Sequence, residues 1–248
     1  MRLEVCVDSD EGMRAAVEGG ADRIELCAAL ALGGLTPSAG QMARAADLPI
    51  PVHALIRARP GDFRFAAGDV EAMLADVRWA RQAGLAGVVL GAALPDGRLD
   101  RAVLSRLREA AGTMSATLNR VFDLVPDREE AVETAVAMGF DRILSSGGAV
   151  LASEGTLALA ATCRAAAGRI AVLPGAGISE QTVGALLECL PVEEVHSSCA
   201  LPVPLDPRAA ALGFGPPEPR HTSAERVRAL KAAMARAQAA RDARQGLR

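Results

Sequence analysis

The 248-residue sequence contains no tyrosine and only 2% aromatic residues, so it offers few rings on which nucleic-acid bases could stack. No block of basic residues compensates for this lack, because the formal net charge is −3. A basic footprint is expected of proteins that bind nucleic acids. We therefore expect no nucleic-acid partner.

Lysine is also nearly absent. The single lysine is Lys231, close to the C-terminal end of the sequence. Schiff-base catalysis needs a lysine in the active site, and a Walker A loop needs Gly-Lys followed by Ser or Thr. Neither chemistry is expected here.

Long apolar runs and paired cysteine motifs are missing too. No stretch is long enough to span a bilayer, and the charged N-terminus does not resemble a signal peptide. We therefore expect a cytoplasmic protein with no membrane partner. The cysteines number five and include no CxxC pair, which argues against a disulfide framework or a zinc ribbon.

What the sequence does contain is one pattern repeated eight times, a short apolar strand followed by a helix. In the second strand, Ile24 and Leu26 alternate with polar residues, which is typical of a strand with one polar face. The strands are predicted at about 3–7, 23–27, 50–57, 87–90, 114–119, 142–145, 170–173 and 194–196. The helices are predicted to begin at or beside Ser9, Ser38, Asp100, Asp127, Ser153 and Ser179.

Eight strand–helix units in a chain of this length predict a (β/α)8 TIM barrel in the α/β class. We expect a single domain over 1–248, with the barrel over about 2–200, a Pro/Gly-rich loop over 201–221 and an extra C-terminal helix over 222–241. A doubly wound open sheet is the alternative. Such a sheet usually has a Gly-rich fingerprint after the first strand, which is absent here.

One internal similarity accompanies this pattern. Residues 20–24, which lead into the second strand, resemble residues 139–143, which lead into the sixth. The two strands are four units apart, as duplication of a half-barrel would require. The alternative is that both segments are ordinary helix-to-strand junctions.

Polar residues cluster at the predicted carboxyl ends of the strands, where active sites of such barrels lie. Glu25, His53 and His196 are the candidate catalytic acids and bases, since burial or nearby charge can move their pKa values toward neutrality. Arginines and Gly-rich loops can bind a carboxylate or phosphate. The candidate anion-binding residues are Arg57, Arg120, Asp123, Ser146, Gly147, Gly175, Gly177 and Ser197.

This set predicts an enzyme that acts on a small anionic metabolite, such as a phosphorylated one, by acid/base chemistry. The alternative is that Glu25, Arg57, Arg120 and Asp123 form an internal layer of salt bridges with a purely structural role.

Two cysteines lie on the same polar faces. Cys6 and Cys27 end adjacent predicted strands, and neighbouring strands are about 5 Å apart, so the two thiols could approach each other. Two soft thiolates favour Cu(I) over hard cations. The alternative is a pair of buried thiols without a metal.

Several segments together resemble the CutC family of copper homeostasis proteins, among them residues 4–9, 20–27, 33–38, 51–53, 61–63 and 194–198. The resemblance covers nearly the whole barrel. It implies a cytosolic TIM barrel, commonly a homo-oligomer, whose proposed Cu(I) ligands correspond to Cys6 and Cys27. One departure is Asn119, which stands where the family usually has a histidine and removes a titrating group from that position.

Overall fold

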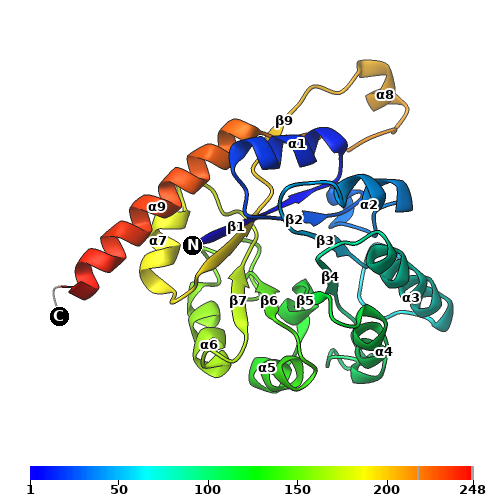
Figure 1. Ribbon diagram of the computed structural model, residues 1–248, viewed down its shortest axis with the longest axis horizontal. Coiled ribbons are helices and arrows are strands. Elements are labelled where there is room, and N and C mark those ends of the chain that lie inside the picture. The colour runs from blue at the N-terminus through cyan, green and yellow to red at the C-terminus, as the bar shows by residue number, and fades with distance from the viewer. Residues whose placement is uncertain (217, 247–248) are drawn as a thin grey trace.

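The computed structural model describes residues 1–216 and 218–246. Its eight-stranded parallel sheet has the order β7-β6-β5-β4-β3-β2-β1-β8, so the last strand returns to the first (Figure 1). The end strands β7 and β8 are also close: a Cβ added to Gly175, just after β7, would lie 3.3 Å from the Cβ of His196 on β8. The predicted TIM barrel is confirmed. Its strands are β1 (Arg2–Val7), β2 (Arg23–Leu26), β3 (Val52–Leu55), β4 (Gly87–Leu90), β5 (Ser115–Leu118), β6 (Arg142–Ser145), β7 (Ala171–Pro174) and β8 (Glu194–Ser197).

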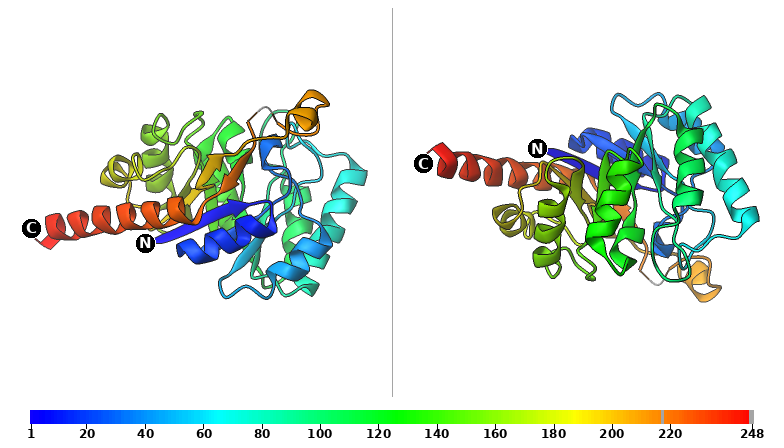
Figure 2. Two further views of the ribbon diagram at one scale, coloured as in Figure 1. Left: turned by 90° about the horizontal axis from the view of Figure 1, so that it is seen from above. Right: turned by 90° about the horizontal axis from the view of Figure 1, so that it is seen from below.

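Helices surround this barrel, as the two views in Figure 2 show. Between the strands lie α1 (Asp10–Gly19), α2 (Ala39–Ala45), α3 (Ala67–Gln82), α4 (Arg101–Ala111), α5 (Arg128–Ala137), α6 (Thr156–Ala166) and α7 (Val183–Cys189). Two short 3-10 helices, η1 (Leu30–Leu32) and η2 (Arg120–Leu124), follow β2 and β5. The long helix α9 (Ala224–Gly246) packs against α1 and α7, and its far end projects beyond the barrel (Figure 1).

Several helices begin where the sequence predicts, because a side chain accepts the first N–H groups. Ser9 Oγ accepts from Gly12 N at 3.0 Å, and Asp127 accepts from the N–H groups of the first turn of α5. Two predicted starts are wrong. Helix α6 begins at Thr156 rather than Ser153, and α7 begins at Val183, because Ser179 lies in a turn in which its N–H donates to Thr182 Oγ1 at 3.0 Å.

The segment after β8 is less irregular than predicted. A short antiparallel pair, β9 (Ala200–Pro202) and β10 (Arg220–Thr222), brings its two ends together, and α8 (Pro207–Ala211) lies in the arm between them (Figure 1). Within the described residues, no helix has the length and apolar character needed to cross a membrane.

The strands have an apolar outer face and a polar inner face. Residues such as Val5, Ile24 and Val195 point toward the helices and are fully buried in the main apolar core. Burial of this surface stabilises the fold by about 25 cal/mol per Å². The alternating residues point into the barrel, where branched aliphatic side chains are usual, yet here many of them are charged.

These charges pair inside the barrel. Arg23 contacts Glu4 and donates through Nη2 to Glu194 Oε2 at 2.6 Å, while Arg142 Nε donates to the same oxygen at 3.2 Å. Glu4 is only 1% exposed and Arg23 only 4%. A salt-bridge layer therefore exists, but it consists of Glu4, Arg23, Arg142 and Glu194. Of the residues that the sequence suggested for it, Arg120 and Asp123 form a separate ion pair.

The similarity between residues 20–24 and 139–143 has a structural counterpart. Asp22 Oδ2 accepts from Leu3 N at 2.7 Å, and Asp141 Oδ2 accepts from Ala116 N at 2.8 Å. In each case the aspartate at the start of one strand binds the preceding strand. The two half-barrels thus repeat the same junction.

Candidate functional site

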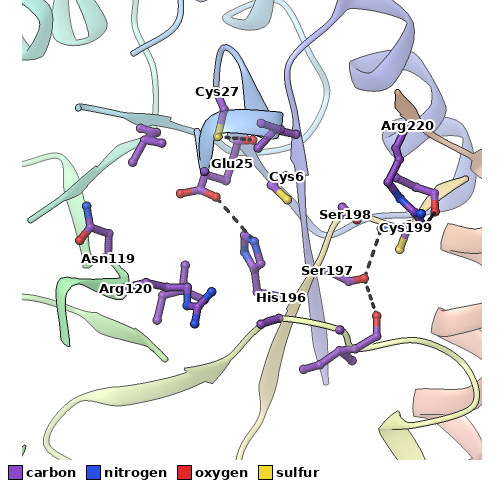
Figure 3. A pocket seen from close by; sticks show the side chains of 18 of the residues that line it. Cys6, Glu25, Cys27, Asn119, Arg120, His196, Ser197, Ser198, Cys199 and Arg220 are labelled. Carbon is purple, nitrogen blue, oxygen red and sulfur yellow. Dashed lines mark hydrogen bonds and ion pairs between the residues drawn. The ribbon is translucent and has the colours of Figure 1, made fainter. Parts of the chain in front are cut away.

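A cavity of about 400 Å³ opens at the carboxyl ends of the strands, where catalytic sites of TIM barrels lie. Most of the predicted site residues reach it. The predicted residues that line it are Cys6, Glu25, Cys27, Arg57, Arg120, Gly177, His196 and Ser197, and Asn119 and Cys199 line it as well. Figure 3 shows Cys6, Glu25 and His196, carried by the neighbouring strands β1, β2 and β8, pointing toward one another at this cavity.

The centre of the site is a group of three donor atoms. One atom each from Cys6, Glu25 and His196 lies within 4.8 Å of the other two. The strands that carry them, β1, β2 and β8, are neighbours in the sheet, and Cys6 lies directly opposite Glu25 in the register. Among the described residues, this is the group of three or more Cys, His, Asp and Glu side chains placed to hold a metal ion.

His196 is held at both ring nitrogens. Its Nδ1 lies 2.8 Å from Glu4 Oε1, and because a carboxylate only accepts, the ring nitrogen donates this hydrogen bond. Its Nε2 faces Glu25 Oε2 at 3.6 Å (Figure 3). Burial alone would lower the pKa of His196, but neighbouring Cys6, Glu4 and Glu25 outweigh burial and raise it well above its usual value.

The two glutamates of this site have opposite pKa shifts. Burial disfavours the Glu4 carboxylate, but the hydrogen bond from His196 and the charge of Arg23 outweigh it and hold the pKa of Glu4 well below its usual range. Burial dominates at Glu25 and raises its pKa to about 7, although the charge of His196 opposes the rise. Glu25 is thus a group that titrates near neutrality inside a cavity.

The sulfur atoms occupy the apolar side of the cavity. Cys6 and Cys27 pack in one buried cluster with Leu55 and Val89. Burial, with the nearby charge of Glu25, raises the pKa of the Cys27 thiol well above its usual value. Both cysteines are buried, Cys6 with 8% and Cys27 with 1% of its surface exposed.

Arg57 lines the cavity, but it mainly holds two loops. Its Nη1 donates to Gly34 O at 2.9 Å, its Nη2 donates to Gly61 O at 2.6 Å, and its guanidinium stacks over the Phe63 ring at 4.8 Å. These bonds join the loop after β2 to the loop after β3. The donors that the sequence assigned to an anion are thus largely engaged by backbone carbonyls.

The predicted anion-binding loop after β6 is occupied by a carboxylate of the protein. Asp123 accepts from Ser146 N and Gly148 N at 3.0 Å and from Ser145 Oγ at 2.6 Å, and Arg120 Nε donates to it at 2.7 Å. Burial opposes the Asp123 carboxylate, but these bonds outweigh it and lower its pKa. Ser146, predicted to bind a ligand, thus holds Asp123, and Gly147 N donates to Ser145 Oγ at 2.9 Å.

His53 lies away from the cavity at the carboxyl ends of the strands, which we call the mouth of the barrel. It is near the start of β3 and lines a separate cavity with Arg23 and Arg142, toward the amino ends of the strands. Burial lowers its pKa to about 4. The sequence grouped His53 with Arg57 because alternation puts both on one face, but alternation does not show that His53 lies near the start of β3 (Val52–Leu55).

The remaining predicted residues support the mouth. Gly175 leaves room beside His196, and Gly177, at φ +71°, turns the loop that lines the cavity. Ser197 Oγ donates to Ile178 O at 2.7 Å and accepts from Cys199 N at 3.2 Å, so it braces two loops.

Sequence reasoning missed two residues of the site. Glu4 shares the inward face of its strand with Cys6, and that alternation was its only signal. Cys199 follows β8 with a φ of +46° and lines the same cavity. Burial raises the pKa of this thiol to about 11.

The chain is similar to known proteins over most of its length. A sequence model of the CutC family matches residues 1–201. CutC family proteins of Sinorhizobium medicae strain WSM419 and Caulobacter vibrioides strain NA1000 are 53% and 50% identical, over 94% and 93% of this chain and 95% and 97% of theirs. A solved structure from Streptococcus agalactiae, described as a candidate copper homeostasis protein CutC, is 25% identical, with a TM-score of 0.75, over 80% of this chain and 98% of that one. The chain therefore belongs to the CutC family.

Proposed function

We propose that this protein binds Cu(I) as a cargo ion at the barrel mouth, through Cys6 and Cys27, and serves copper handling. The observation that carries the proposal is the packing of these two thiols in one buried cluster beside the cavity. Thiolates are the ligands that Cu(I) prefers. The name of the Streptococcus agalactiae relative, which refers to copper homeostasis, also supports a role in copper handling.

The surroundings of the two thiols suit a soft, easily oxidised ion. Leu55 and Val89 belong to the same buried cluster as the two cysteines, so that side of the site is apolar. On the open side the cavity gives an ion a route in and out, as delivery of a cargo requires. The imidazole of His196 stands close enough to Cys6 to add a nitrogen donor.

An anaerobic Cu(I) titration against a chromophoric competitor ligand tests this proposal. We expect one Cu(I) per chain in the wild type, a loss of affinity of about tenfold or more in Cys6→Ser and in Cys27→Ser, and no specific binding in the double variant. Cys163→Ser is the matched control, because Cys163 is only partly buried on α6, outside the cavity. Equal copper binding by the wild type and the double variant would overturn the proposal.

A second candidate function is an acid/base enzyme for a small anion. The observation in its favour is Glu25, with a pKa of about 7, beside His196 in a cavity of about 400 Å³. Arg120 is the better anion-binding candidate, since 43% of its side chain is exposed at the mouth, whereas Arg57 joins loops. Thermal-shift screening with inorganic phosphate and sugar phosphates, on wild type and Arg120→Ala, is the test, and the absence of any ligand-dependent shift counts against this function.

We also propose a cytoplasmic location and a homo-oligomeric state, as the family resemblance implies. Light scattering coupled to size exclusion measures the second directly, and a monomer at all concentrations would contradict it.

A further inference from the structure

We propose that Cys6, Glu25 and His196 form a site for a divalent cation of borderline hardness, Zn(II) in particular. This site shares Cys6 with the proposed Cu(I) pair, but it requires neither Cys27 nor copper. It would add a Lewis-acid function to the barrel mouth.

The donor set decides between the metals. It consists of one sulfur, one imidazole nitrogen and one carboxylate oxygen. Zn(II) is bound by all three donor types, whereas Cu(I) selects soft sulfur ligands and gains little from a carboxylate. A contribution of Glu25 to metal binding would therefore distinguish a zinc site from a copper site that also uses Cys6.

The distances are close to those a tetrahedral ion needs. Zn(II) ligands at about 2.0–2.3 Å from the metal lie roughly 3.5 Å from one another. Nε2 of His196 and Oε2 of Glu25 are already 3.6 Å apart, and the three donors all lie within 4.8 Å of one another. Side-chain rotations that move the donor atoms by about 1 Å would complete the contacts without movement of the strands.

A buried carboxylate holds the imidazole in the required orientation. Nδ1 of His196 donates to Glu4 at 2.8 Å, which leaves Nε2 directed at Cys6 and Glu25. Zinc-bound histidines usually donate their other ring N–H to a carboxylate, a backbone carbonyl or a water, and here the acceptor is a carboxylate. Glu4 is itself fixed by Arg23, which binds Glu194 in turn. His196 is thus held in place by a chain of contacts through Glu4 and Arg23 to Glu194 inside the barrel.

Three protein ligands leave one coordination position open. The position faces the cavity of about 400 Å³, whose far wall carries Asn119 and Arg120 (Figure 3). Three protein ligands with an open fourth position distinguish catalytic zinc sites from structural ones. An oxygen-bearing small molecule, such as a carboxylate or a carbonyl compound, is the chemical class that this open position would take.

Co(II) is the probe for the first experiment, because its tetrahedral thiolate complexes absorb visible and near-ultraviolet light. We expect one Co(II) per chain of reduced wild-type protein, displaced by Zn(II). Cys6→Ser should lose the sulfur charge-transfer band, and Glu25→Gln and His196→Gln should weaken binding about tenfold or more. Cys163→Ser, on α6 outside the cavity, is the matched control and should bind Co(II) as the wild type does. Cys27→Ser is the discriminating variant, because a site made by Cys6, Glu25 and His196 should keep its Co(II) without Cys27.

A second measurement avoids any variant that fails to fold. The chain has only three histidines, His53, His196 and His221, so their ring nitrogens can be resolved by ¹⁵N NMR of the wild type. Zn(II) should shift Nε2 of His196 and leave its Nδ1 protonated, while the other two rings stay unchanged. A His196 ring that does not respond to Zn(II), or equal Co(II) binding by wild type and Glu25→Gln, would overturn the inference.

The two metal proposals can be tested independently, because different variants should affect each of them. Cys27→Ser should weaken Cu(I) binding by about tenfold or more and spare Co(II), whereas Glu25→Gln should weaken Co(II) and spare Cu(I). If Cys27→Ser weakens Co(II) as strongly as Cys6→Ser does, the cavity holds only the two-sulfur site.

Discussion

Glu4 and His196 are 192 positions apart in the chain, yet Nδ1 of His196 lies 2.8 Å from Oε1 of Glu4 inside the barrel. The contact joins the first strand to the eighth, at the point where the ends of the barrel sequence meet. Glu4 also contacts Arg23, so one carboxylate links the proposed metal-binding layer above to the ionic layer below. The stability of the barrel and the geometry of its mouth therefore depend on the same side chain.

Glu4→Gln should destabilise the protein strongly. Removing one partner of a buried ion pair leaves the other charge uncompensated, which costs about 3–5 kcal/mol. Urea unfolding followed by circular dichroism measures the change. Glu71→Gln is the matched control, since the Glu71–Arg106 pair is exposed and such pairs stabilise little. Equal stability of the two variants would show that the buried network adds nothing.

Asp123→Ala should destabilise the loop after β6, and a small anion should restore it. The substitution leaves the buried N–H group of Ser146 without its acceptor, at a cost of about 1–3 kcal/mol. Formate can enter the space vacated by the carboxylate, so we expect it to raise the melting temperature of Asp123→Ala specifically. Asp127→Ala, which removes a helix cap at the surface, should show no such recovery.

His53 should make the protein sensitive to mild acid. Its pKa falls to about 4 in the folded state because of burial, against about 6.5 when unfolded. The unfolded chain therefore binds the proton first, so stability is lost as the pH falls from about 6.5 to about 4, by about 3 kcal/mol in all.

Urea unfolding across this pH range tests the expectation with His53→Gln, which cannot titrate. The stability curve of this variant should fall less steeply than that of the wild type between about pH 6.5 and about pH 4. His221→Gln, at an exposed position, should follow the wild type. Parallel curves for all three proteins would mean that His53 is not buried in its neutral form.

Arg57→Met should loosen the mouth loops. The guanidinium joins Gly34 to Gly61, so its loss frees both loops while the strands remain packed. Hydrogen exchange should become faster by about tenfold or more in residues 28–36 and 60–64 and stay unchanged in β1 and β5. Arg64→Met is the control, because Arg64 forms an exposed ion pair with Asp62. Unchanged exchange in Arg57→Met would make Arg57 a ligand-binding candidate once more.

Much of the fold could be predicted from the sequence because two local signals agreed. Alternation, as at Ile24 and Leu26, identified strands and their inner faces, and glycines after helices marked the turns. The rule that sites lie at the carboxyl ends of barrel strands then gathered Cys6, Glu25, Cys27 and His196 correctly into one cavity.

The hydrogen-bond and ion-pair partners of the side chains could not be predicted in the same way. Nothing in the sequence near Asp123 shows that its carboxylate fills the loop after β6, since that depends on backbone N–H groups more than 20 positions away. His53 was misplaced because periodicity indicates which face a residue occupies and not its depth along the barrel axis. The distance of a residue from the rim depends on the stagger between strands, which is a property of the closed sheet.

The shared junction at Asp22 and Asp141 gives the two halves of the barrel a common frame, in which positions can be matched one to one. Three residues further along each strand, Cys6 matches Asn119 and Glu25 matches Leu144. The two halves therefore share the backbone junction but carry different side chains at the matched positions. A molecule entering the cavity therefore meets Cys6 and Glu25 on one side and Asn119, Arg120 and Leu144 on the other, so its two ends would face different chemical groups.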